Sequence, residues 1–313
     1  MQLVEDLNQI KTPYPNAVVT IGNFDGVHRG HQLLFQSLRK KAEQISGTSV
    51  VITFDPHPLR VLSKKKMPAL ITLKEQKIEL IADAGVDVCL CIPFTKSFAG
   101  ITAAEFVEEI LIRRLGMKAM VVGEDYAFGR NREGDIAFLQ RAAEKFGFEL
   151  VCLEKASLDG LTPKISSTEI RNRVSAGDMD VAHEMLGRYY QIRGEVVSGR
   201  GRGARTLGFP TANIKLADEL CPLAGVYAVV VRHAGRQYRG VANIGYSPTF
   251  DDHIFTVEVH ILHFDEAIRG HQVRVDFVQR IRNEKKFAGI EELKAQIQQD
   301  IDAAERLLAE KGF

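Results

Sequence analysis

The sequence of 313 residues predicts an α/β domain with a parallel sheet, followed by an antiparallel β-barrel and a terminal helix. In the first part, short apolar runs alternate with helical patterns, which is typical of repeated β-α units. From Tyr190 onward, short alternating runs are separated by turns that contain glycine, as in a barrel or sandwich. An apolar stripe with helical spacing closes the chain. We therefore expect one domain over residues 1–186 and a second over residues 187–313.

The strands and helices of the first domain alternate regularly. The expected strands are 17–21, 49–54, 87–92, 118–122 and 148–153. The expected helices lie near 29–46, 73–84, 102–115 and 135–146. Ligands of such sheets bind beyond the carboxyl ends of the strands. Three marked loops, 22–31, 53–58 and 123–129, follow predicted strands, so we expect them to share one rim.

The second domain shows a different pattern. Its expected strands are 191–197, 226–231, 238–244, 256–262 and 272–277. Near the end, an apolar stripe repeats at i, i+4 and i+8, formed by Leu293, Ile297, Ile301, Ala304 and Leu308. We expect this helix to pack against the barrel, and a partner-binding helix is the alternative.

Composition limits the class of protein. The chain is 45% hydrophobic and 26% charged, as in ordinary globular proteins, and its net charge is +1. That charge gives no general reason to expect nucleic acid or a membrane as a partner. The sequence shows no secretory signal pattern and no apolar run of membrane-spanning length, so we expect a cytoplasmic protein. The four cysteines lack C-x-x-C spacing and are expected to be buried reduced thiols: Cys89, Cys91, Cys152 and Cys221.

The turn after the first strand is the strongest site signal. It runs Gly-Asn-Phe-Asp-Gly-Val-His-Arg-Gly-His over residues 22–31. Glycines allow close backbone approach, and free N–H groups at a helix start attract anions, so the string predicts phosphate binding. His28 and His31 lie on one side of a helical turn. Surface exposure and zinc binding are alternatives, although zinc would need a third protein ligand that the neighbouring sequence lacks. The other expected phosphate-binding residues of this turn are Gly22, Phe24, Asp25, Gly26 and Gly30.

This string resembles the HxGH nucleotidyltransferase superfamily, which implies a Rossmann-like domain. There the two histidines contact ATP phosphates and stabilise charge on the α-phosphate, which implies catalytic roles for His28 and His31. The Ser-Ser-Thr-x-x-Arg segment at Ser166, Ser167, Thr168 and Arg171 is similar to one that closes over the triphosphate in that superfamily. Taken alone, the segment reads equally well as a helix N-cap. Arg171 adds a guanidinium that can hold phosphate with two hydrogen bonds.

A second block begins as a glycine-arginine run and ends in Gly-Phe-Pro-Thr-Ala-Asn over 208–213. Gly199, Gly201 and Gly208 can bring backbone N–H groups around phosphates. Thr211 and Asn213 supply oxygen ligands suited to Mg²⁺. The arginine run also fits a basic linker or a nucleic-acid contact, but a linker would not need the segment that follows. Further along, Glu258 alternates with valines, so it either faces solvent or points into a site as a base.

The second block resembles the riboflavin kinases, whose marker is Pro-Thr-Ala-Asn. Together with the first half, nearly the whole chain resembles the bacterial bifunctional riboflavin kinase/FMN adenylyltransferase family. The resemblance implies that Thr211 and Asn213 bind Mg²⁺ with the nucleotide, and that Glu258 is the kinase general base. It also places three residues near the flavin: Arg282, Glu284 and Phe287. The family often has Tyr where this chain has Arg269, and some members have Asn in place of Asp125.

The resemblance implies two successive reactions with ATP as co-substrate. The barrel domain phosphorylates riboflavin to FMN, and the first domain joins FMN to the adenylyl group of ATP, giving FAD and pyrophosphate. Further candidates for cradling or hydrogen-bonding the flavin or adenine are Phe54, Pro56, Pro58, Asp125 and Phe128. For Phe54, core packing is an equal alternative. Two rival functions are a nucleotidyltransferase for another substrate, which leaves Glu258 unexplained, and a flavin- or RNA-binding regulator, which only the basic run favours.

Overall fold

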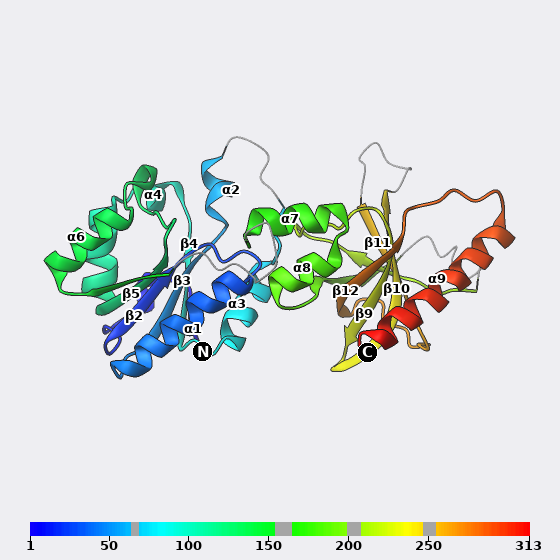
Figure 1. The fold of residues 1–313 in the computed structure, drawn as a ribbon, viewed down its shortest axis with the longest axis horizontal. Coiled ribbons are helices and arrows are strands. Elements are labelled where there is room, and N and C mark those ends of the chain that lie inside the picture. Colours follow the sequence, from blue (N-terminus) through cyan, green and yellow to red (C-terminus); the bar gives the residue numbers. More distant parts are fainter. Residues whose placement is uncertain (64–68, 154–164, 199–207, 247–254) are drawn as a thin grey trace. The chain divides into compact units, whose positions relative to one another are not determined.

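The computed structural model describes residues 1–63, 69–153, 165–198, 208–246 and 255–313 (Figure 1). Contacts between residues divide the chain into two compact units. The N-terminal unit comprises Met1–Pro68 and Thr72–Ser167, and the C-terminal unit comprises Ala69–Ile71 and Thr168–Phe313. This division groups residues 168–186 with the barrel, whereas the functional boundary at residue 186 stays a prediction.

The N-terminal unit is built on a parallel sheet of six strands. In spatial order these are β1 (Gln2–Val4), β4 (Val88–Pro93), β3 (Ser49–Asp55), β2 (Ala17–Ile21), β5 (Met117–Gly123) and β6 (Glu149–Leu153). Every neighbouring pair runs parallel. The five predicted strands are confirmed. The edge strand β1 was not predicted, because three residues are too few to show an alternating pattern.

Helices cover both faces of this sheet. On one face, α1 (Arg29–Gln44) and α3 (Lys74–Asp83) bury Phe35, Leu38 and Ile81 against the strands. On the other face, α6 (Ile136–Phe146) and the π-helix η2 (Phe106–Arg114), which continues α5 (Ala103–Glu105), bury a second cluster. The four predicted helices are thereby confirmed, as is the parallel α/β architecture (Figure 1). Shorter helical segments are η1 (Leu7–Gln9), α2 (Pro58–Leu62), α4 (Lys96–Ala99) and η3 (Arg130–Arg132).

The C-terminal unit is a closed antiparallel barrel. Its strands follow the spatial order β10 (Arg236–Tyr246), β11 (Phe255–Ile261), β8 (Ala212–Lys215), β7 (Tyr190–Val197), β12 (Gln272–Arg282) and β9 (Gly225–His233). The five predicted strands are confirmed, and the short strand β8 was missed. Two helices, α7 (Ser167–Ala176) and α8 (Met179–Leu186), precede the barrel in the chain.

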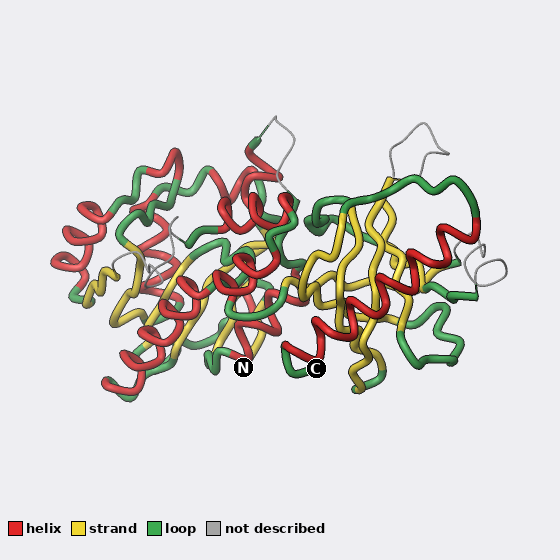
Figure 2. The backbone as a smooth tube through the Cα atoms, turned by 45° about the vertical axis from the view of Figure 1, so that its right-hand side comes forward, coloured by secondary structure: helices red, strands yellow, loops and turns green. Residues whose placement is uncertain are grey.

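The terminal helix α9 (Ile290–Glu310) lies along the outside of the barrel (Figure 2). Ile301, Ala304 and Leu308 are buried against a barrel face that includes Val226 and Val241. The apolar stripe therefore packs on the barrel, as predicted.

A short segment of the chain belongs to a different unit from the residues that flank it in sequence. Residues 69–71 group with the C-terminal unit, although the residues on either side group with the N-terminal unit. The N–H of Leu70 donates to the carbonyl oxygen of Asp218 (3.2 Å), and the N–H of Leu220 donates to that of Leu70 (2.7 Å). Leu70 thus pairs in parallel with Glu219.

The cysteines differ in exposure. All four are free, and Cys89 and Cys91 are buried in β4 as predicted. The prediction of a buried thiol is wrong for Cys152, which is exposed because its strand β6 forms the edge of the sheet. Cys221 is half-buried. Within the described parts of the chain, we find no helix of the length and apolarity needed to cross a membrane.

Candidate active sites

The strand order places the three marked loops beside one another. β2 lies between β3 and β5 and is parallel to both, so the loops that follow these strands leave the same edge of the sheet. The chain continues from β2 toward β3 on one side, and β5 lies on the other side. A ligand crevice forms at such a switch point in parallel α/β sheets. The prediction that the loops share one rim is confirmed.

The two histidines stand at the start of α1. His28 is the N-cap residue, and its Nδ1 accepts a hydrogen bond from the N–H of His31 at 3.4 Å. Their rings stack, with centroids 3.6 Å apart and an angle of 19° between the ring planes. Phe24 packs edge-on against the ring of His31. This arrangement orients two imidazoles at a helix N-terminus, where the dipole favours an anion.

A hydrogen-bond network fixes the turn that carries these histidines. The Asp25 carboxylate accepts from the N–H of Thr72 at 3.0 Å, and the Thr72 hydroxyl accepts from the N–H of Gly26 at 3.0 Å. Asp25 and Thr72 are both buried. The Ser167 hydroxyl donates to the carbonyl oxygen of Asp25 at 2.9 Å, so the Ser-Ser-Thr segment does reach the turn. Thr72 was missed by the sequence analysis because an isolated threonine gives no signal.

Polar and glycine residues around this turn occupy less buried positions. Gly22 is half-buried after β2, Gly30 is half-buried in the first turn of α1, and Ser166 is half-buried before α7. Thr168 is exposed in α7. Arg171, on the same helix, donates from Nε to the carbonyl oxygen of Ala69 at 3.0 Å.

The loop after β3 turns sharply into α2. The Asp55–Pro56 peptide bond is cis, and Pro58 takes the first position of α2. His57 caps that helix, its Nδ1 accepting from the N–H of Leu59 at 3.2 Å. Pro56 is exposed and Pro58 is half-buried, so both are reachable from the rim.

Aromatic side chains connect the second loop with the third. Phe54 packs against Phe94 and Phe98, with ring centroids 5.4 and 5.8 Å away. Phe98 contacts Phe106, which in turn contacts Phe128 in the loop after β5. Phe54 and Phe128 are only partly buried, so each combines a packing contact with a surface at the rim. Asp125, in that third loop, is exposed.

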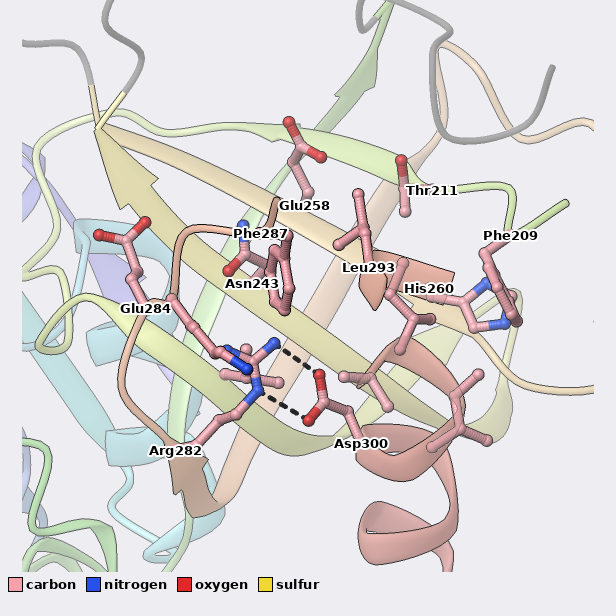
Figure 3. A pocket seen from close by; sticks show the side chains of 15 residues that line it. Phe209, Thr211, Asn243, Glu258, His260, Arg282, Glu284, Phe287, Leu293 and Asp300 are labelled. Carbon is pink, nitrogen blue, oxygen red and sulfur yellow. Dashed lines mark hydrogen bonds and ion pairs between the residues drawn. The ribbon is translucent and has the colours of Figure 1, made fainter. Parts of the chain in front are cut away.

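The C-terminal unit has a cavity of about 350 Å³ between the outer face of the barrel and α9 (Figure 3). Its lining includes the predicted residues Thr211, Glu258, Arg282, Glu284 and Phe287. The other lining residues, which were not predicted for the site, include Phe209, Asn243, His260, Lys285 and Asp300. The structure thus brings together five of the residues that the sequence had suggested for the barrel domain. Asp300 was missed because a single carboxylate in the polar part of an amphipathic helix gives no signal in the sequence.

Register explains how Glu258 reaches this cavity. On β11, Val257 and Val259 are buried in the barrel, whereas Glu258 alternates to the outer face and is half-buried. Asn213 on β8 and Asn243 on β10 are its direct cross-strand partners. Directly opposite residues share one face of a sheet, so these two amide side chains flank the carboxylate. Of the two earlier alternatives for Glu258, the one that points it into a site is supported.

One wall of the cavity is fixed by an ion pair. Arg282 donates from Nε and Nη2 to the two carboxylate oxygens of Asp300, at 2.8 and 2.7 Å. The Asp300 side chain is 5% exposed and that of Arg282 is 22% exposed. The Arg282 guanidinium also lies 5.8 Å from the centre of the Phe287 ring. This geometry joins β12, α9 and the segment between them around the cavity.

A second cavity of about 260 Å³ meets the first at Thr211. Its lining includes Pro210 and Ala212 on one side, and Asp265, Glu266 and Arg269 on the other. Gly208 is exposed in the left-handed region, with φ +81°. The predicted phosphate-binding residues Gly199 and Gly201 lie outside the described residues.

The residues available for a metal differ between the units. In the described segments, no group of three or more His, Cys, Asp and Glu residues is arranged to hold a metal ion, so the zinc alternative for His28 and His31 gains no third ligand. Thr211, Asn213 and Glu258 offer oxygen atoms only, which suits Mg²⁺ bound mainly through substrate phosphates.

Comparison with known proteins accounts for both units. Residues 10–169 match the family model "FAD synthetase", and residues 186–308 match "Riboflavin kinase". The chain is 41% identical to a bifunctional riboflavin kinase/FMN adenylyltransferase of Pseudomonas fluorescens over 99% of this chain and 98% of that protein. It is 39% identical to the protein of that name from Escherichia coli K12, over 96% of each chain.

A solved structure agrees in fold over the whole length. A crystal structure from Streptococcus pneumoniae, described as a macrolide-efflux protein, matches with a TM-score of 0.87 and 32% identity, over 97% of this chain and 98% of the other. These matches confirm the family resemblance that the two marker strings had suggested. The chain belongs to the bifunctional riboflavin kinase/FMN adenylyltransferase family.

Proposed function

We propose that this protein makes FAD in two steps, with Glu258 acting in the first and the pair His28 and His31 in the second. Membership of the family supports both activities, with the kinase in the C-terminal unit. The observation that carries the division of labour is the separation of two phosphate-handling sets in two units: a buried turn at a helix start, and a carboxylate on a barrel cavity.

In the kinase step, riboflavin occupies the cavity beside α9 and ATP occupies the second cavity. Both cavities are lined by Thr211, so the acceptor hydroxyl and the γ-phosphate meet there. Glu258 accepts the proton of the riboflavin 5′-hydroxyl, whose oxygen attacks the γ-phosphate and releases ADP. Thr211 and Asn213 would hold Mg²⁺, which would neutralise charge on the phosphates. Arg282 and Phe287 line the wall against which the flavin ring packs.

In the second step, a phosphate oxygen of FMN attacks the α-phosphate of ATP, and pyrophosphate leaves. An ionised phosphate needs no strong base, so this site works by alignment and by stabilising charge. His28, His31 and the first N–H groups of α1 supply donors at the start of the helix. Ser167 holds the turn through its hydrogen bond to Asp25.

The test is to follow riboflavin, FMN and FAD by chromatography after incubation with ATP and Mg²⁺. Glu258→Gln keeps the shape of the side chain but removes its basicity, so FMN formation is lost while added FMN is still converted to FAD. His28→Asn keeps a side chain that can cap α1 but removes the imidazole, so FMN accumulates and FAD does not form. Loss of both activities in either folded variant would contradict this division.

Location and partners follow from the same proposal. Riboflavin, FMN and ATP are the expected small-molecule partners, and the cytoplasm is the expected compartment. Fractionation of cells with an antibody against the protein tests the compartment. Salt-sensitive RNA binding without turnover of flavin would instead favour the regulator hypothesis.

A further inference from the structure

A buried lysine lies next to the rim of the N-terminal unit. Lys77, on α3, is 6% exposed. Its Nζ donates to the carbonyl oxygen of Phe54 at 3.0 Å and to that of Asn23 at 3.3 Å. Lysines are almost never fully buried unless they are paired. A buried ammonium that binds two backbone carbonyls therefore calls for an explanation.

The two carbonyls lie where β2 and β3 end, next to the two loops that flank the candidate site. Asn23 lies in the turn that leads from β2 to His28 and His31, and Phe54 lies near the end of β3, just before the turn that contains Pro56. The hydroxyl of Thr53 donates to the same Asn23 oxygen at 3.2 Å. Lys77 is thus a bridge between the ends of the adjacent strands β2 and β3.

Within the described parts of the chain, Lys77 forms no direct ion pair. Across the described residues, no carboxylate oxygen lies within 4.0 Å of its Nζ, and its two hydrogen-bond acceptors are neutral. Burial lowers the pKa of Lys77 below its ordinary value, and the carboxylates of Asp25 and Asp55 oppose this effect. A site that binds two anionic substrates gains from such a charge, because it adds positive potential where phosphates must approach each other.

We propose that Lys77 is a positioning residue for adenylyl transfer, which fixes the His28 turn and the Pro56 loop relative to each other. The inference rests on the proposed second step and adds to it a residue that touches neither substrate. Its mechanism is geometric: the FMN phosphate must line up with the α-phosphate, and a misplacement of about 1 Å can cost on the order of 100-fold in rate.

The test compares Lys77→Met, which keeps the length of the side chain and removes its charge and donors, with the wild-type protein. We expect kcat for conversion of FMN to FAD to fall by about 10- to 100-fold, while KM for FMN and for ATP changes less than about threefold. The kinase activity of the same preparation reports on folding and stays within twofold. Lys77→Gln can still donate to one carbonyl, so its kcat for conversion of FMN to FAD should lie between those of the wild type and Lys77→Met. This variant replaces Lys77→Met if Lys77→Met is insoluble.

Lys74→Met is the matched control. Lys74 lies on the same helix, contacts Glu5 at 2.6 Å and Asp55 at 3.9 Å, and its side chain is 33% exposed. The Lys74→Met substitution removes a positive charge from the same helix but leaves the Lys77 hydrogen bonds in place, so FAD formation stays near the wild-type rate. A pH profile adds a second readout: wild-type adenylylation falls as pH rises through the lowered pKa of Lys77, and this fall is absent in Lys77→Met.

The outcomes separate this inference from the proposed function. If the wild-type protein converts no FMN to FAD, the proposed second step itself fails. If wild type is active but Lys77→Met and Lys77→Gln retain kcat within threefold, the positioning role is refuted. An equal loss of kinase and adenylylation activities would show a role in the fold alone and would also overturn the proposal.

Discussion

The ion pair between Arg282 and Asp300 gives a prediction whose size can be worked from the structure. Asp300→Asn keeps the shape of the side chain but removes the charge that receives two hydrogen bonds. Breaking a buried ion pair costs about 3–5 kcal/mol. Arg282 is 22% exposed and can partly rehydrate, and Asn retains one acceptor, so we expect a loss of about 2 kcal/mol in the free energy that holds Arg282 in place.

That loss has a measurable consequence at the flavin cavity. About 2 kcal/mol corresponds to roughly a 30-fold change in an equilibrium constant, so we expect the KM for riboflavin to rise by about 10- to 30-fold. The assay titrates riboflavin at saturating ATP and Mg²⁺ and measures FMN. Asp302→Asn is the matched control, because Asp302 lies on the same helix, is exposed and interacts with Gln298. A KM for riboflavin in Asp300→Asn within twofold of the control would refute the reasoning, as would an equal loss of FMN adenylylation.

Three further predictions follow from packing and exposure. A Cβ on Gly134 would lie 2.5 Å from the ring of Phe128, so Gly134→Ala should displace that ring. We expect the KM for FMN in adenylylation to rise by about 10-fold and the kinase activity to stay unchanged. Flavin chromatography measures both activities. Iodoacetamide should label Cys152 first, because this cysteine is exposed. Burial raises the pKa of Cys89 to about 12 and should protect its thiol until the protein unfolds. Peptide mass spectrometry measures the order of labelling, and early labelling of Cys89 would contradict its burial. Leu308→Ala should destabilise the C-terminal unit by about 2–5 kcal/mol in urea unfolding, because the side chain is fully buried between α9 and the barrel; a loss below 1 kcal/mol would argue against that packing.

The sequence predicted the elements whose patterns are long or strongly periodic. The four buried strands β2, β3, β4 and β5 and the stripe on α9 are examples, because a continuous apolar run or a helical repeat records which face is buried. The strands β1 and β8, with three and four residues, carry no such record. These strands form because a neighbouring strand offers hydrogen bonds, and the residues of that neighbour lie in another part of the sequence.

The candidate sites divide in the same way. His28 and Glu258 were found because motifs or alternation single them out. Thr72 and Lys77 were missed, because the groups that they contact lie far away in sequence and are mostly backbone atoms. A side chain that binds backbone leaves no complementary side chain to recognise in the sequence. Asn243 stands beside Glu258 only through the register of β10 and β11.

The pairing of Leu70 with Glu219 limits how the enzyme can be dissected into fragments. A fragment that begins at residue 187 contains all six barrel strands but lacks the segment that satisfies the backbone of Asp218 and Leu220. The exposed N–H and C=O groups would then have to be solvated or would offer an edge to other chains. During synthesis, Leu70 must also wait until β7, β8 and the segment after them are made before its partner exists.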